Sequence, residues 1–144
     1  MIPEAGELHH VAVVVPSIEA SLPHYRDTLG LRAGPVREVT DQRVRVVFLE
    51  APNASIELIQ PTDDTSGVAR FLAERGKPTL HHLCFVVDDL RGTLAALTRR
   101  GVELIDREPR LGALGEVAFL HPRATDGVLV ELIDRASLAK PHTS

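Results

Sequence analysis

The sequence contains a single cysteine, Cys84, and few aromatic residues, which make up 3% of its 144 residues. One cysteine excludes an intramolecular disulfide framework and is typical of a protein from a reducing compartment. Because aromatic side chains are scarce, Val, Leu, Ile and Ala must pack most of the core. A hydrophobic content of 44% is sufficient for a folded domain.

Long apolar runs and basic clusters are also missing. The longest apolar run, Val11 to Val15, is far shorter than the roughly 20 residues that cross a bilayer. The opening MIPEAGEL has no basic stretch before an apolar one, which argues against a secretory signal. Scattered arginines and a net charge of -4 argue against a nucleic-acid surface. We therefore expect a cytoplasmic protein with no membrane or nucleic-acid partner.

The chain repeats itself. Residues 8–22, LHHVAVVVPSIEASL, resemble residues 80–94, LHHLCFVVDDLRGTL, which begin 72 positions later (80 minus 8). In the same way, IELI at residues 56–59 corresponds to VELI at residues 130–133, and Phe48-Leu49 corresponds to Phe119-Leu120. Because these similarities keep their order along the chain, the sequence predicts two copies of one structural module.

Each copy has the pattern of a βαβββ module. In the first copy, Ser17 is the expected N-cap of a helix that Gly30 stops, and in the second, Asp88 or Asp89 caps a helix that ends at Gly101. Extended segments surround these helices. They are predicted over residues 11–15, 31–39, 43–50 and 54–60 in the first copy, and over 80–87, 102–106, 116–120 and 128–133 in the second.

The expected organisation is a first module over residues 1–62, a linker over 63–79 and a second module over 80–144. In the linker, Thr65-Ser66 can cap a short helix that Gly76 ends. A four-stranded half-sheet cannot bury both of its faces alone. We therefore expect an α+β fold in which two tandem βαβββ modules form an eight-stranded, cup-shaped sheet with the helices outside, together making one domain.

Four potential metal ligands occupy equivalent positions in the two copies: His10 and His82 in the first strands, Glu57 and Glu131 in the last. Each Glu stands between apolar neighbours, so strand alternation turns its carboxylate away from the apolar face, toward solvent or a cation. One His in a strand is more often a core residue than a ligand. Four such residues in register favour a divalent metal site with positions left for a substrate.

The histidines occur in pairs, His9-His10 and His81-His82. Successive residues of a strand point to opposite faces, so only one histidine of each pair can belong to the ligand set. The residues alone leave open which one it is.

The most specific segment of the chain is residues 101–132, which contain EPRLGALG, FLHP and GVLVEL. The opening LHHVAVVV, the linker PTDDTSGVARFLAERG and the LHH that follows it are also characteristic. Together these motifs resemble the vicinal-oxygen-chelate superfamily and, within it, the methylmalonyl-CoA epimerase family. The resemblance runs from about Leu8 to Asp134.

This resemblance implies metal ligands at His10, His82 and Glu131, with Glu57 as a fourth. The ion it implies is divalent, cobalt or manganese first, with zinc, nickel or iron(II) as alternatives. It further implies a homodimer that binds an acyl-CoA substrate and epimerises methylmalonyl-CoA at C2 through a metal-stabilised enolate. Glu131 corresponds to one base proposed for the family.

The second base is where the chain departs from the family. Several bacterial epimerases have a Glu at about the position of Val46; Glu50, two alternations further along the same face, is the candidate here. Three alternatives stay open: a glyoxalase-type isomerase or lyase, a dioxygenase that uses Fe(II), and a non-catalytic ligand-binding protein. The EPRLGALG and FLHP segments favour the epimerase, whereas the missing carboxylate favours the binding protein.

Overall fold

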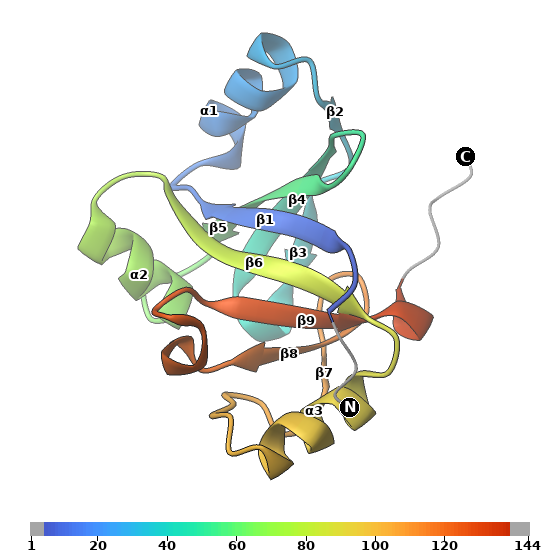
Figure 1. The fold of residues 1–144 in the computed structure, drawn as a ribbon. Helices are drawn as coiled ribbons and strands as arrows, with labels where there is room; N and C mark the ends of the chain where they lie inside the picture. The colour runs from blue at the N-terminus through green and yellow to red at the C-terminus, as the bar shows by residue number, and fades with distance from the viewer. Residues whose placement is uncertain (1–4, 139–144) are drawn as a thin grey trace. The chain divides into compact units, whose positions relative to one another are not determined.

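The computed structural model describes residues 5–138. The chain divides into two compact units, one made of Met1–His9 with His82–Ser144 and the other of His10–His81 (Figure 1). The amino-terminal segment is therefore part of the same unit as the second half of the chain. Among the described residues, no helix is both long and apolar enough to cross a membrane.

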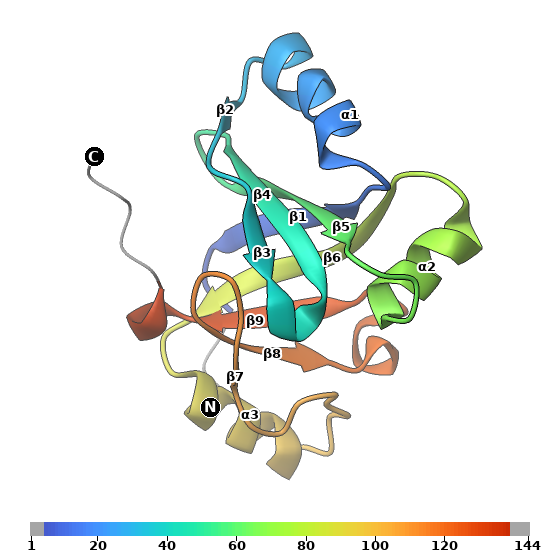
Figure 2. The same cartoon turned by 180° about the vertical axis from the view of Figure 1, so that it is seen from behind.

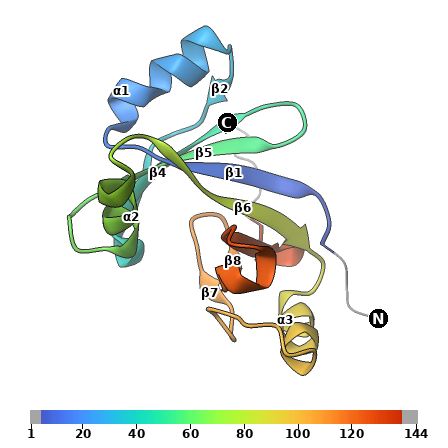
Figure 3. The ribbon, with the colours of Figure 1, turned by 60° about the vertical axis from the view of Figure 1, so that its left-hand side comes forward.

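In the unit His10–His81, β1 pairs in parallel with β5, and β5 pairs antiparallel with β4, which also pairs with the short strands β2 and β3. Figure 2 shows β3 and β4 as a hairpin. Figure 3 shows α1 on one side of β4 and β5. The elements are β1 (Leu8–Val14), α1 (Ile18–Pro23), the π-helix η1 (His24–Thr28), β2 (Arg32–Ala33), β3 (Arg37–Val39), β4 (Val44–Glu50), β5 (Ser55–Pro61) and α2 (Gly67–Arg75).

The other unit repeats this pairing pattern. Its first strand, β6, pairs in parallel with its last, β9, and β9 pairs antiparallel with β8, which pairs with β7. The α+β class and the two βαβββ copies predicted from the repeat are thus present. The elements are β6 (Thr79–Val87), α3 (Leu90–Arg99), β7 (Arg110–Leu111), β8 (Glu116–Leu120) and β9 (Val130–Asp134).

The helix that follows the first strand begins in the same way in both units. The Ser17 hydroxyl accepts a hydrogen bond from the backbone N–H of Ala20, and the Asp89 carboxylate accepts one from that of Gly92, both at 3.1 Å. Each cap satisfies one of the N–H groups that the first turn of a helix leaves unpaired. The prediction for Ser17 is confirmed. Of the two candidates Asp88 and Asp89, the residue that caps the second helix is Asp89.

The helix ends also agree with the sequence, with one local difference. Gly30, Gly76 and Gly101 all have positive φ angles, between 71° and 79°, and follow the helices that they were predicted to stop. The first helix changes at Pro23, after which the chain continues as the π-helix η1. Proline has no N–H to donate to the preceding turn, which accounts for a change of helix type at this residue.

Each half-sheet has one face covered by its helix. In the unit His10–His81, Ile18 of α1 packs on alternate residues of the strands, namely Val13, Val47, Leu49 and Leu58. In the other unit, Leu90 and Leu94 of α3 pack on Val87, Ala118, Leu120, Val130 and Leu132. The residues between these positions point to the opposite face of each half-sheet.

Two predicted strands were wrong. The segment 31–39 is not one strand, because Gly34-Pro35-Val36 separates β2 from β3. A proline cannot donate a hydrogen bond to a sheet, so pairing stops there. The segment 102–106 forms no regular strand, although it lies beside β8: an isolated bridge joins Leu104 to Leu120, and the N–H groups of Ile105 and Asp106 both donate to the carbonyl of Phe119. The short strand β7 (Arg110–Leu111) pairs with the other end of β8, opposite Val117 and Glu116.

The amino-terminal segment is anchored by charge and by backbone hydrogen bonds. The N–H of Gly6 donates to the carbonyl of Val86 at 2.6 Å, and that of Val86 donates to the carbonyl of Glu7 at 3.0 Å. The Arg135 guanidinium lies 2.7 Å from the Glu7 carboxylate and holds the pKa of Glu7 below its usual value, chiefly by hydrogen bonding. This segment thus extends the pairing of β6.

In the loop before β8, a small substitution is expected to have a large effect on stability. A Cβ added at Gly115 would lie 2.6 Å from the backbone carbonyl oxygen of Ser137, which cannot move without disturbing its own turn. Gly115→Ala is expected to cost about 1–3 kcal/mol of stability, typical of overpacking. The thermal unfolding midpoint should fall by roughly 3–12 °C. Gly67→Ala is the matched control, since a Cβ there meets no atom within 4 Å. Equal midpoints for the two variants would contradict this prediction.

Candidate metal centre

The unit His10–His81 contains a buried pair of a histidine and a carboxylate. The Nε2 atom of His10 lies 3.2 Å from Oε1 of Glu57, and both side chains are less than a tenth exposed. Glu57 lies directly across from Phe48 of β4 in the strand register. The ring of Phe48 packs edge-to-face on the His10 imidazole, with 5.4 Å between centroids.

The other unit contains the same arrangement. The Nε2 atom of His82 lies 3.2 Å from Oε1 of Glu131, and both side chains are again buried. Glu131 lies across from Phe119 of β8, whose ring packs edge-to-face on His82 at 5.3 Å. The repeat in the sequence is therefore a repeat of a three-residue cluster: His, Glu and Phe.

Both pairs lie on the sheet face away from the helix of their unit. In β9, Val130 and Leu132 belong to the core under α3, so Glu131 between them points to the other face. In β5, Leu58 packs with α1, so its neighbour Glu57 also points to the face away from the helix. A carboxylate in a buried strand needs a compensating charge or hydrogen bond, since burial of a bare charge is costly.

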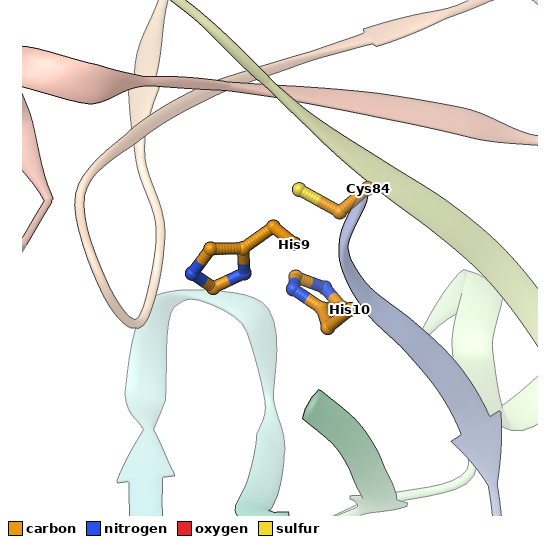
Figure 4. Close-up of side chains that lie close together, drawn as sticks. All are labelled: His9, His10 and Cys84. Atoms are coloured by element: carbon orange, nitrogen blue, oxygen red, sulfur yellow. The ribbon is translucent and has the colours of Figure 1, made fainter. Parts of the chain in front are cut away.

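The structure distinguishes the two histidines in each pair. His10 is buried beside Glu57, whereas His9, the preceding residue of β1, is only partly buried. Figure 4 shows both imidazoles, on successive residues of β1. The ring of His81 packs edge-to-face on Phe71 of α2, with 4.9 Å between centroids, while His82 has the carboxylate partner. His10 and His82, the histidines of the predicted ligand set, thus each lie beside a buried carboxylate.

The donor chemistry of each pair fits a divalent cation. Imidazole nitrogens and carboxylate oxygens bind such ions at about 2.1 Å, so two neighbouring ligand atoms at a right angle are about 3.0 Å apart. The observed separations of 3.2 Å agree with this geometry. The packed phenylalanine rings leave the imidazoles little freedom to turn, a condition that a preformed metal site requires.

The predicted second base has a different environment. Val46 and Glu50 lie on the same face of β4 as Phe48. Val46 is 2% exposed, so a buried apolar side chain stands at the position for which the family resemblance implies a carboxylate. Glu50 is exposed at the end of the strand, across from Ser55. It shares the face of Glu57 without being buried beside it.

The two phenylalanines are the site residues that sequence reasoning did not assign. The correspondence of Phe48-Leu49 with Phe119-Leu120 was visible in the repeat, but it was used only to align the copies. With aromatic residues at 3% of the chain, their recurrence at equivalent positions was a usable signal. Phe119 also has the Arg110 guanidinium over its ring, 5.3 Å from the centroid.

The chain is similar to known proteins over most of its length. The Glyoxalase/Bleomycin resistance protein/Dioxygenase superfamily matches residues 9–119 of the chain. An ethylmalonyl-CoA/methylmalonyl-CoA epimerase of Cereibacter sphaeroides is 40% identical over 129 residues, which cover 88% of this chain and 96% of that protein. A mitochondrial methylmalonyl-CoA epimerase of Dictyostelium discoideum is 37% identical and covers 90% of this chain and 79% of its own length.

Solved structures show the same relationship. A hypothetical protein of Bacillus halodurans C-125 matches with a TM-score of 0.88 and 33% identity over 96% of this chain and all of that one. The methylmalonyl-CoA epimerase of Mycobacterium tuberculosis matches with a TM-score of 0.85 and 31% identity, over 95% and 90% of the two chains. The predicted fold class is thereby confirmed. The chain belongs to the glyoxalase, bleomycin resistance protein and dioxygenase superfamily and, within it, to the methylmalonyl-CoA epimerase family.

Proposed function

We propose that this protein is an acyl-CoA epimerase that interconverts the 2R and 2S forms of methylmalonyl-CoA or a close homologue. The observation that carries the proposal is the buried His–Glu pair that recurs in both units at the same separation. The names of the relatives support the substrate class, because epimerases of methylmalonyl-CoA match this chain over most of its length. The EPRLGALG and FLHP segments support the same reaction against a glyoxalase-type or dioxygenase alternative.

We infer that His10, Glu57, His82 and Glu131 together hold one divalent ion, with cobalt and manganese as the first ions to test. One pair alone offers two donor atoms, fewer than catalytic metal sites use, whereas two pairs offer four and leave positions for substrate oxygens. The equivalent placement of the pairs in the two copies supports this inference. When bound, such an ion supplies positive charge to the carbonyl oxygens that flank C2.

Epimerisation requires that a proton leave C2 on one face and that another arrive on the opposite face. On this proposal the Glu131 carboxylate accepts or returns the proton on one face. Phe48 and Phe119 hold the His10 and His82 imidazoles in place through their ring contacts. The homodimer and the cytoplasmic location expected from the sequence stay predictions.

Glu50 is the proposed base for the opposite face. Glu50→Gln is expected to slow exchange of the C2 proton by about 10²-fold, the lower range for loss of a general base. The measurement is deuterium uptake started separately from the 2R and the 2S substrate, since loss of one base should affect the two directions unequally. Glu38→Gln, at an exposed carboxylate of β3, is the control. Unchanged rates with Glu50→Gln would remove Glu50 from the mechanism.

The direct test of the proposed function is solvent deuterium uptake. Metal-loaded protein is incubated with one epimer of methylmalonyl-CoA in D₂O, and loss of the C2 proton signal is followed together with conversion to the other epimer. The proposal predicts both. Tight binding of the substrate without any exchange would instead support the ligand-binding alternative, which the apolar Val46 favours.

A further inference from the structure

Arg110 brings a positive charge to the sheet face that carries the His82–Glu131 pair. It is the one lysine or arginine within the strands β6, β7, β8 and β9. In the strand register Arg110 lies across from Val117, and Val117 lies across from Ile133. Ile133 is two residues from Glu131 in β9, so these side chains all point to the face away from α3.

The guanidinium of Arg110 is close to the proposed metal ligands of this unit. Its Cζ atom lies over the Phe119 ring, 5.3 Å from the centroid, and that ring packs edge-to-face on His82, also at 5.3 Å. The guanidinium is therefore no farther from the imidazole than the sum of these two distances. An acyl group whose oxygens bind an ion at His82 would have this guanidinium near its other end.

The position of Arg110 is held without using up its hydrogen-bonding groups. Its Nε lies 3.5 Å from Oδ2 of Asp106, farther apart than the atoms in the ion pairs of Arg123 and Arg135, which are 2.6–2.9 Å long. The same Oδ2 already accepts a hydrogen bond from the Phe119 N–H at 2.8 Å. A guanidinium has five N–H donors, and 49% of this side chain is exposed. Arg110 can therefore donate to a bound anion from its present place.

We propose that Arg110 binds the carboxylate of the acyl group and thereby selects a malonyl-type acyl-CoA over an uncharged one. This rests on the proposed function. The substrate has two kinds of anionic group, the acyl carboxylate and the CoA phosphates. The carboxylate is bonded to C2, whereas the phosphates lie beyond the long pantetheine arm. When C2 is beside Glu131, the carboxylate is thus the anion near Arg110. A guanidinium donates two parallel hydrogen bonds to a carboxylate, which suits this role.

The test compares malonyl-CoA with acetoacetyl-CoA by isothermal titration calorimetry on the cobalt-loaded full chain. Both thioesters contain CoA and a second oxygen at the same place in the acyl group, but only malonyl-CoA has a carboxylate. Arg110→Gln is expected to weaken malonyl-CoA about tenfold or more, as loss of a hydrogen bond to a charged group does, and to leave the affinity for acetoacetyl-CoA unchanged. Arg110→Lys keeps the charge without the paired donors and should recover part of the loss.

Two further variants separate contact with the substrate from support of the loop. Asp106→Asn keeps an oxygen for the Phe119 N–H but removes the negative charge beside Arg110, so malonyl-CoA should bind at least as tightly as before. If this variant weakens malonyl-CoA as much as Arg110→Gln does, the arginine only supports the loop and the proposal is overturned. Arg91→Gln removes another exposed guanidinium, which pairs with Glu116, and should change neither affinity.

The same measurements distinguish this proposal from the proposed function. Equal weakening of both thioesters by Arg110→Gln would place the arginine on a part that they share, the CoA phosphates included, and would overturn the proposal. Deuterium uptake at C2 of methylmalonyl-CoA is followed in the same preparations. No uptake by the unaltered chain, together with selective weakening of malonyl-CoA in Arg110→Gln, would contradict the epimerase and support this role of Arg110. Normal uptake with no selective weakening would contradict only the role of Arg110.

Discussion

Replacing Glu131 with Gln is expected to slow deuterium exchange at C2 of methylmalonyl-CoA by about 10³-fold or more. The substitution keeps the shape of the side chain, so the packing around β9 should persist. It removes a general base, which typically contributes 10²–10⁴-fold, and also the negative charge that faces the His82 imidazole at 3.2 Å. The rate is measured by proton NMR in D₂O at saturating metal and substrate.

Two matched variants show whether the effect is specific. Glu57→Gln changes the equivalent carboxylate of the other pair, and because Glu57 is a proposed metal ligand but not a proposed base, we expect a smaller loss of about tenfold. Glu116→Gln removes an exposed carboxylate that pairs with Arg91 and should leave the rate unchanged. An exchange rate for Glu131→Gln within threefold of the unaltered chain would exclude Glu131 as the base.

Removal of the metal should lower thermal stability as well as activity. An ion that binds only the folded chain adds about 2.7 kcal/mol of stability at a concentration 100 times its Kd. For a chain of this size, the unfolding midpoint should rise by roughly 6–11 °C when cobalt or manganese is added to chelator-treated protein. The physical reason is that Glu57 and Glu131 are 6% and 8% exposed, so a bound cation compensates buried negative charge.

The control for this measurement compares the metal-dependent rise within each variant. His10→Ala and His82→Ala should both lose most of it, whatever their midpoints without metal. His121→Ala should keep it, because that imidazole lies outside both pairs, beside Glu103 at 3.5 Å. If the rise is the same in all three variants, the ion binds elsewhere on the protein.

Much of the fold and the two glutamates of the candidate site could be predicted because their signals are local or repeated, whereas the choice of His10 and His82 within the histidine pairs came from the family resemblance. Ser17 and the pair Asp88-Asp89 were identifiable as cap candidates because a side-chain oxygen before an apolar run has a specific use at a helix start. Gly30 and Gly101 marked helix ends because left-handed backbone favours glycine. In each of two strands a single Glu stands between apolar residues. Because successive side chains of a strand point to opposite faces, this pattern predicted that the Glu lies on the face away from the apolar core.

Other features depend on contacts that a single sequence does not display. The segment 102–106 has the apolar residues of a strand and lies beside β8, yet Ile105 and Asp106 both donate to the one carbonyl of Phe119, so no regular ladder forms. The contact of Phe48 with His10 joins residues far apart in the chain, and only the repeat hinted at it.

We propose that one imidazole and one carboxylate from each half of the chain bind a single ion. Equilibrium dialysis against cobalt, with metal and protein both quantified, measures this directly. One ion per chain in the unaltered protein, lost with His10→Ala and equally with His82→Ala, is the predicted result. Two ions per chain, or one that survives either substitution, would show that the two pairs act separately.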